Sequence, residues 1–203
     1  MTIYPNLINP LNYSDYKDLV FKLALDGSTT GEETIERVES TKINAQRIKR
    51  IDKTYVPSEE IEKIIEQISS NHRWILLTES WCGDGAQNLP IIAKLAQLNS
   101  NINLEIVLRD QNPELMDMHL TSGTRSIPKL IVLDAQTNDL IFEWGPRPAS
   151  IYSMVQEYKK EHPVMLHDEF VKQLHLWYAH DKGRSLEKDL VTLINTFVEK
   201  SKS

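Results

Sequence analysis

Residues 74–90 read WILLTESWCGDGAQNLP, and this stretch decides the fold. Its first five residues form a short apolar run, which predicts a buried strand. A glycine-flanked turn follows at residues 81–85, and apolar residues then recur at helical spacing through residues 86–98. The sequence therefore predicts a strand, a tight turn that carries the only cysteine, Cys82, and a helix.

Cys82 lies at the start of the predicted helix, and this position bears on its chemistry. Backbone N–H groups in the first turn of a helix lack partners within the helix, so they favour a thiolate, lowering the thiol pKa by about one unit. Asp84, two residues later, opposes the thiolate by a like-charge effect of similar size. We expect Asp84 and Glu79 to be solvated on opposite sides of the turn. The sequence leaves the ionisation of Cys82 undecided.

A second stretch, residues 125–132, reads RSIPKLIV, and its proline opens another apolar strand. The motifs W-C-G-x-x and R-x-I-P, in this order, resemble the thioredoxin superfamily over residues 68–158. The resemblance implies an α/β, thioredoxin-like fold, in which a central mixed sheet of four or five strands has helices on both faces. It also implies a cis peptide bond before Pro128, in a loop that faces Cys82.

The resemblance places the functional site on these two loops, with Cys82 as the catalytic residue. Trp81 is expected to form a wall of the site, and Arg125 is interpreted either as steering an anionic thiol or as a simple loop cation. The residues expected to contact substrate are Trp81, Gly83, Asp84, Gly85, Arg125, Ile127 and Pro128.

The chain departs from the thioredoxin pattern at three positions. Where a thioredoxin has its second, resolving cysteine, this chain has Gly85. Thioredoxins also keep a buried acid in the strand before the turn and a lysine on the neighbouring strand; Leu76 and Ile106 occupy those positions. A Cys82 thiolate can attack a disulfide, but no second cysteine resolves the mixed disulfide that results.

Composition narrows the class of protein. The chain has 203 residues, 40% of them hydrophobic, a formal net charge of −6 and one cysteine. The hydrophobic content predicts a folded core, and the acidic charge argues against nucleic-acid binding. No apolar run approaches the ~18 residues of a membrane span, and the N-terminus lacks the pattern of a signal peptide. We expect a cytoplasmic protein, with no membrane partner, that is a monomer or weak dimer.

Three segments are predicted: an N-terminal helical extension at 1–57, a thioredoxin-like domain at 58–160, and a C-terminal helical extension at 161–203 that packs on the core. Apolar stripes in both extensions need cover. A basic run on the second N-terminal helix is interpreted as a solvated helix face rather than a patch for an anionic partner. No metal site is expected, because the six histidines show no close metal-binding spacing: His72, His119, His162, His167, His175 and His180.

Three functions fit these observations. The preferred one is a monothiol oxidoreductase or thiol sensor that forms mixed disulfides with a protein or small-molecule thiol or disulfide. It needs no bound cofactor, and an external thiol such as glutathione would release the mixed disulfide. The second is a redox-inactive module that binds an extended peptide between the Trp81 turn and the Pro128 loop. The third is an iron–sulfur site shared between two chains, since the turn is loosely similar to that of monothiol glutaredoxins. Cys82 could also be no more than a small buried apolar residue.

Overall fold

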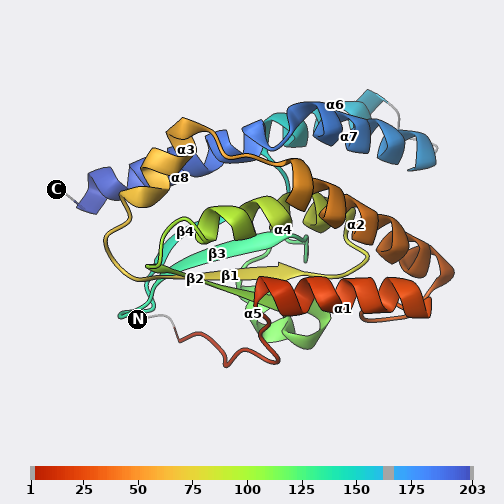
Figure 1. Ribbon diagram of the computed structural model, residues 1–203, viewed down its shortest axis with the longest axis horizontal. Coiled ribbons are helices and arrows are strands. Elements are labelled where there is room, and N and C mark those ends of the chain that lie inside the picture. Colours follow the sequence, from red (N-terminus) through yellow and green to blue (C-terminus); the bar gives the residue numbers. More distant parts are fainter. Residues whose placement is uncertain (1–2, 162–166, 202–203) are drawn as a thin grey trace.

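A four-stranded mixed sheet forms the centre of this computed structural model, which describes residues 3–161 and 167–201 (Figure 1). The strands are β1 (His72–Thr78), β2 (Ile102–Leu108), β3 (Lys129–Asp134) and β4 (Leu140–Trp144). Their order is β2-β1-β3-β4, with β1 and β2 parallel and the other pairs antiparallel. Leu76 pairs with Ile106 across β1 and β2, and both are fully buried.

Helices cover both faces of the sheet, as predicted. The side chains of β1 alternate: Trp74 and Leu76 pack with helices α3 (Glu59–Glu66), α4 (Gly83–Ala96) and α8 (Arg184–Ser201). Ile75 and Leu77 face the other way, toward the short helices η1 (Arg109–Gln111) and α5 (Pro113–Met118), where they pack with Leu115 and Met116 of α5. The turn that carries Cys82 therefore lies between β1 and the helix that crosses the first face.

The N-terminal extension forms helices α1 (Tyr13–Asp26) and α2 (Ile35–Thr54), which lie side by side, with α2 also against α4 (Figure 1). Each begins at a polar cap, because the side chains of Asn12 and Thr34 accept hydrogen bonds from backbone N–H groups of the first turn. Buried residues of both helices belong to the main core. This extension is therefore packed rather than loose.

The C-terminal part of the chain forms α6 (Ala149–Glu161), α7 (His167–Asp181) and α8. Apolar residues of α6 and α7 make their own cluster, and α8 joins the main core through Leu186, Leu190 and Ile194. Their apolar stripes are thus covered within the chain. The predicted boundary at 160/161 adjoins residues 162–166, which lie outside the described part together with His162. No helix in the described ranges is long and apolar enough to cross a membrane.

Two polar side chains join neighbouring segments at opposite edges of the sheet. Asn112 stands at the start of α5, but its side chain does not cap the helix; it bonds instead to the backbone of Ile8 and Leu108. At the opposite edge of the sheet, the Glu143 carboxylate pairs with His119 at 2.6 Å and with Lys129 at 2.8 Å. These two partners lower the pKa of Glu143 to about 2, against the opposing effect of its burial.

Candidate functional site

Cys82 is held between the start of α4 and the loop that precedes β3. Its Sγ accepts a hydrogen bond from Gly85 N–H at 3.2 Å, so the thiol is the N-cap of α4. The thiol also donates to the carbonyl of Ile127 at 3.4 Å, and the Ile127–Pro128 bond in that loop is cis. The structure therefore brings together the two motifs that are some forty residues apart in the sequence.

Burial determines the ionisation state of Cys82, which the sequence alone left undecided. Only 6% of Cys82 is exposed, and this burial, with the nearby charge of Asp84, raises the pKa of the thiol to about 12. The Gly85 N–H and the Arg147 guanidinium lower this pKa but do not offset the burial. The resting side chain is a neutral thiol at physiological pH, not the thiolate that its helix-start position favours.

Asp84 is not solvated, contrary to expectation: it is 8% exposed and links the turn to two distant segments. One carboxylate oxygen pairs with Arg147, from the loop after β4, at 2.6 Å. The other accepts a hydrogen bond from Tyr178 of α7 at 2.9 Å, and Asn88 donates to the same hydroxyl. Glu79, expected on the surface as well, is 1% exposed and accepts the backbone N–H of Asp110. Burial raises the pKa of Glu79.

The N-terminal extension holds the residues just before the cysteine. The hydroxyl and N–H of Ser80 bond to Thr30, and its carbonyl accepts from Asn44 of α2. Trp81 lies against the guanidinium groups of Arg37 and Arg109, whose carbon atoms are 4.6 and 5.0 Å from its ring centre. The predicted wall of the site is thus fixed by α2 and by the segment after β2.

The two glycines of the turn are required by close approaches. A Cβ at Gly85 would collide with the hydroxyl of Thr78 at the end of β1. A Cβ at Gly83 would lie 2.9 Å from the ring of His175 on α7 and 3.3 Å from Nη1 of Arg47 on α2. Both extensions therefore reach the Cys82 turn itself.

These segments enclose a cleft of about 820 Å³ beside Cys82. It lies between α2, the Cys82 turn, the loop before Pro128, the loop after β4, and α7. Of the predicted site residues, it is lined by Trp81, Cys82, Gly83, Asp84, Arg125 and Ile127. Gly85 packs beneath the turn instead.

Five residues that line the cleft were not among the predicted site residues: Arg37, Arg47, Arg109, Arg147 and His175. The arginines of α2 belonged to a run that was interpreted as a solvated face. No sequence motif marks Arg147 as a functional residue, and His175 was considered only as a metal ligand. Arg125 lines the cleft, but two of its nitrogens each bond to Asp117 at 2.6 Å.

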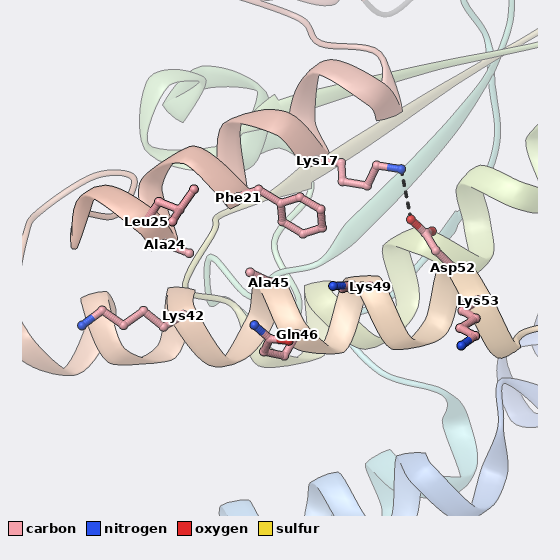
Figure 2. Close-up of a pocket in the computed structure, with 10 residues that line it drawn as sticks. All are labelled: Lys17, Phe21, Ala24, Leu25, Lys42, Ala45, Gln46, Lys49, Asp52 and Lys53. Atoms are coloured by element: carbon pink, nitrogen blue, oxygen red, sulfur yellow. Dashed lines mark hydrogen bonds and ion pairs between the residues drawn. The ribbon is translucent and has the colours of Figure 1, made fainter.

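A second hollow, of about 670 Å³, lies between α1 and α2 (Figure 2). Its floor includes Phe21, Ala24 and Ala45, and its rim carries four lysines together with Asp52, which pairs with Lys17 at 3.2 Å. None of its lining residues belongs to the Cys82 turn. The basic run on α2 is thus divided between two faces: Lys42, Lys49 and Lys53 line this hollow, while Arg37 and Arg47 line the cleft.

Within residues 3–161 and 167–201, no three His, Cys, Asp or Glu side chains are grouped so that they could hold a metal ion. The cleft instead offers one thiol, five arginines, a neutral histidine and four carboxylates, those of Glu32, Glu36, Glu39 and Asp84. Such a set of groups can exchange disulfides or bind anions.

Comparison with solved structures shows that the fold recurs in other proteins. A protein of unknown function from Pseudomonas aeruginosa, PA1234, is 18% identical, with a TM-score of 0.57 over 92% of this chain and 98% of its own. An HIV 4E10 epitope scaffold is also 18% identical, with a TM-score of 0.55 over 92% of this chain and 99% of its own. These likenesses concern the fold alone.

No curated protein matches the sequence. The family model described as Thioredoxin matches residues 31–159, well over half of the 203 residues. The match includes the Cys82 turn, the loop before β3 and also α2, which precedes the segment that resembled thioredoxins in sequence. The chain therefore belongs to the thioredoxin family.

Proposed function

We propose that this thioredoxin-fold protein exchanges thiols at Cys82, forming a slow and long-lived mixed disulfide that an external thiol releases. One observation carries the proposal: Cys82 lines the 820 Å³ cleft, and its sulfur lies at the start of α4 and beside the Ile127 carbonyl. A disulfide bound in this cleft would meet the one cysteine of the chain.

The raised pKa makes this exchange slow without making it impossible. At pH 8, a thiol with a pKa of about 12 is ionised to roughly 1 part in 10⁴, about 10³·⁴ times less than an ordinary cysteine. A thiolate of higher pKa is also a stronger nucleophile. With a Brønsted slope of about 0.45, a pKa higher by about 3.5 units increases the rate constant of the thiolate about 10¹·⁶-fold. The net rate is therefore about 10² times lower than that of a free cysteine.

The raised pKa of Cys82 also makes the mixed disulfide long-lived. In the forward step the Cys82 thiolate attacks one sulfur of a disulfide, a new S–S bond forms, and the other sulfur leaves as a thiolate that takes up a proton. In release, an external thiolate attacks the mixed disulfide and Cys82 must leave, which a thiol of high pKa does slowly. Because Gly85 replaces the resolving cysteine, release depends on the external thiol.

Mass spectrometry after treatment with glutathione disulfide at pH 8 tests the proposal. We expect one glutathionyl adduct on the native protein, none on Cys82→Ser, and removal by reduced glutathione but not by thioredoxin reductase alone. The same protein unfolded in urea supplies the rate of an ordinary cysteine, and the native rate should be about 10² lower. A reaction that occurred only through global unfolding would be slower by at least roughly 10³·⁵, for a stability of about 5 kcal/mol.

A second candidate, a redox-inactive binding module, is favoured by the burial of Cys82 and by the hydrogen bond that its thiol donates to Ile127. In that function the thiol would be structural, and the cleft would bind its ligand without covalent chemistry. A native rate at or below the global-unfolding limit would exclude thiol exchange and favour this module.

A further inference from the structure

Five arginines line the Cys82 cleft, and four of them are paired with carboxylates. Arg37 pairs with Glu32, Arg109 with Asp110, Arg125 with Asp117 and Arg147 with Asp84. Arg47 is different. Its Nη1 donates to the neutral side chain of Asn44 at 2.8 Å, and no carboxylate of the described residues lies within ion-pair distance of it. Arg47 thus brings a positive charge to the cleft that is not neutralised by direct pairing.

His175 is oriented by a relay from α2 through α4. Arg50 donates to the side-chain oxygen of Gln87 at 3.0 Å, so the amide nitrogen of Gln87 faces Nδ1 of His175, at 3.2 Å. An amide nitrogen can only donate, so Nδ1 accepts, and the neutral ring carries its proton on Nε2. Burial and then the charges of Arg47, Arg147 and Arg50 lower the pKa of His175 to about 3, so the ring is neutral at physiological pH.

The two groups converge beside the cysteine. The point where a Gly83 side chain would begin is 3.0 Å from Nε2 of His175 and 3.3 Å from Nη1 of Arg47, and both residues line the cleft. Gly83 follows Cys82 directly in the chain. A guanidinium and an N–H donor therefore lie together one residue away from the thiol.

We infer that Arg47 and His175 form an anion subsite of the cleft, so that the ligand exchanged at Cys82 is a thiol or disulfide that carries an oxyanion, such as a carboxylate. The inference rests on the proposed exchange function and specifies its substrate class. A guanidinium with no carboxylate partner forms strong charge-assisted hydrogen bonds with an oxyanion, and the imidazole N–H adds a second donor. No oxidant is needed, because the incoming disulfide is reduced as Cys82 is oxidised.

Two aromatic disulfides provide the test. Dithiobis(2-nitrobenzoate) carries carboxylates and 4,4′-dithiodipyridine carries none, and each releases a coloured thiol when it reacts with Cys82. The rates are measured on native wild type, Arg47→Gln, Arg47→Lys and His175→Phe. Arg125→Gln tests the alternative that the anion binds at another arginine of the cleft, and Arg184→Gln on α8, outside the cleft lining, is the control for net charge. Thermal unfolding checks that each variant is folded.

We expect Arg47→Gln to lower the rate with the carboxylate reagent about tenfold and to leave the rate with dithiodipyridine unchanged, because one charge-assisted hydrogen bond is lost in a partly screened site. His175→Phe should lower the first rate severalfold, Arg47→Lys should keep most of it, and Arg184→Gln should match wild type. His175→Phe keeps the test decisive if Arg47→Gln does not fold.

Different failures have different readouts. If both reagents react with wild type but Arg47→Gln and His175→Phe leave the ratio of the two rates unchanged, the subsite is wrong while thiol exchange stands. If Arg125→Gln alone lowers the ratio, the anion is bound elsewhere in the cleft, and the inference is likewise wrong. If neither reagent modifies native wild-type Cys82, the exchange function and the inference fail together.

Discussion

Asp84→Asn should make Cys82 more reactive, although it removes a buried ion pair. After burial, the charge of Asp84 is the largest contribution that raises the pKa of the thiol to about 12. Asparagine has nearly the same shape and can still accept the hydrogen bond from Tyr178. It removes the negative charge and also leaves Arg147 free to favour the thiolate. Both changes lower the pKa of Cys82.

The size of the effect follows from two opposing factors. A like charge at this distance shifts a pKa by about one unit, so the thiolate population at pH 8 rises about tenfold. The thiolate of lower pKa is a weaker nucleophile by about threefold, for a Brønsted slope near 0.45. We therefore expect a net increase of about threefold in the rate with dithiodipyridine, which is neutral and does not itself interact with the removed charge.

Arg147→Gln should have the opposite effect. The Arg147 guanidinium lowers the pKa of Cys82, and its loss also leaves the charge of Asp84 unpaired, so the rate should fall about threefold. Asp117→Asn is the control for net charge, because this carboxylate is exposed and paired with Arg125.

Absorbance of the released thione between pH 7 and 10 gives the rates, and each should rise about tenfold per pH unit, because the thiol remains below its pKa throughout. Unfolding in urea should show that Asp84→Asn costs about 1–3 kcal/mol, since two buried donors lose a charged partner. A rate for folded Asp84→Asn equal to that of Asp117→Asn, or lower, would refute the electrostatic reasoning.

Three further predictions concern packing and charge. Gly85→Cys should destabilise the fold by about 1–3 kcal/mol, because the new side chain collides with Thr78. Adding Thr78→Ala should relieve the collision and permit a disulfide with Cys82, seen as a loss of two mass units. Equal stability of the single and double variants would contradict this prediction. Leu190→Ala in α8 should cost about 2–5 kcal/mol in urea unfolding, whereas exposed Leu176→Ala should cost under about 0.5; a small loss at Leu190 would mean that α8 folds apart from the core. The lowered pKa of Glu143 stabilises the fold above pH 4.5, and this contribution, about 2 kcal/mol after allowance for partial exposure, is lost as the pH falls to about 2. Glu143→Gln should remove this part of the loss of stability at acid pH. If the stability of the variant falls as steeply with pH as that of the wild type, the ion pair is not responsible.

The order of elements could be predicted because its signals are local. Apolar spacing within 74–90 and 125–132 predicts the two strands and the helix between them. Asn12 and Ser58, residue types that favour helix N-caps, cap α1 and α3. The resemblance to thioredoxins rests on two short motifs in order, and the family match confirms it. Such signals need no knowledge of what lies far away in the chain.

The chemistry of the site could not be predicted in the same way, because it depends on distant segments. The pKa of Cys82 is set by burial, and Asp84 is buried by Arg147 and Tyr178, which lie 63 and 94 residues further along. On α2, arginines of the cleft and lysines of the α1 hollow are interleaved in one basic run. Only the packing of α2 between α1 and α4 separates them.

Restoring a resolving cysteine would take more than one substitution. Gly85 leaves no room for a side chain beside Thr78, so a cysteine there requires a second change. Leu76 and Ile106 face each other across β1 and β2 and are fully buried in the main core, where an acid or a lysine would be costly to desolvate. Since these three positions are all fitted to apolar or backbone packing, the fold can be stable without the dithiol machinery. In the proposed exchange, specificity would come from the cleft, where both extensions place charged and polar side chains beside Cys82.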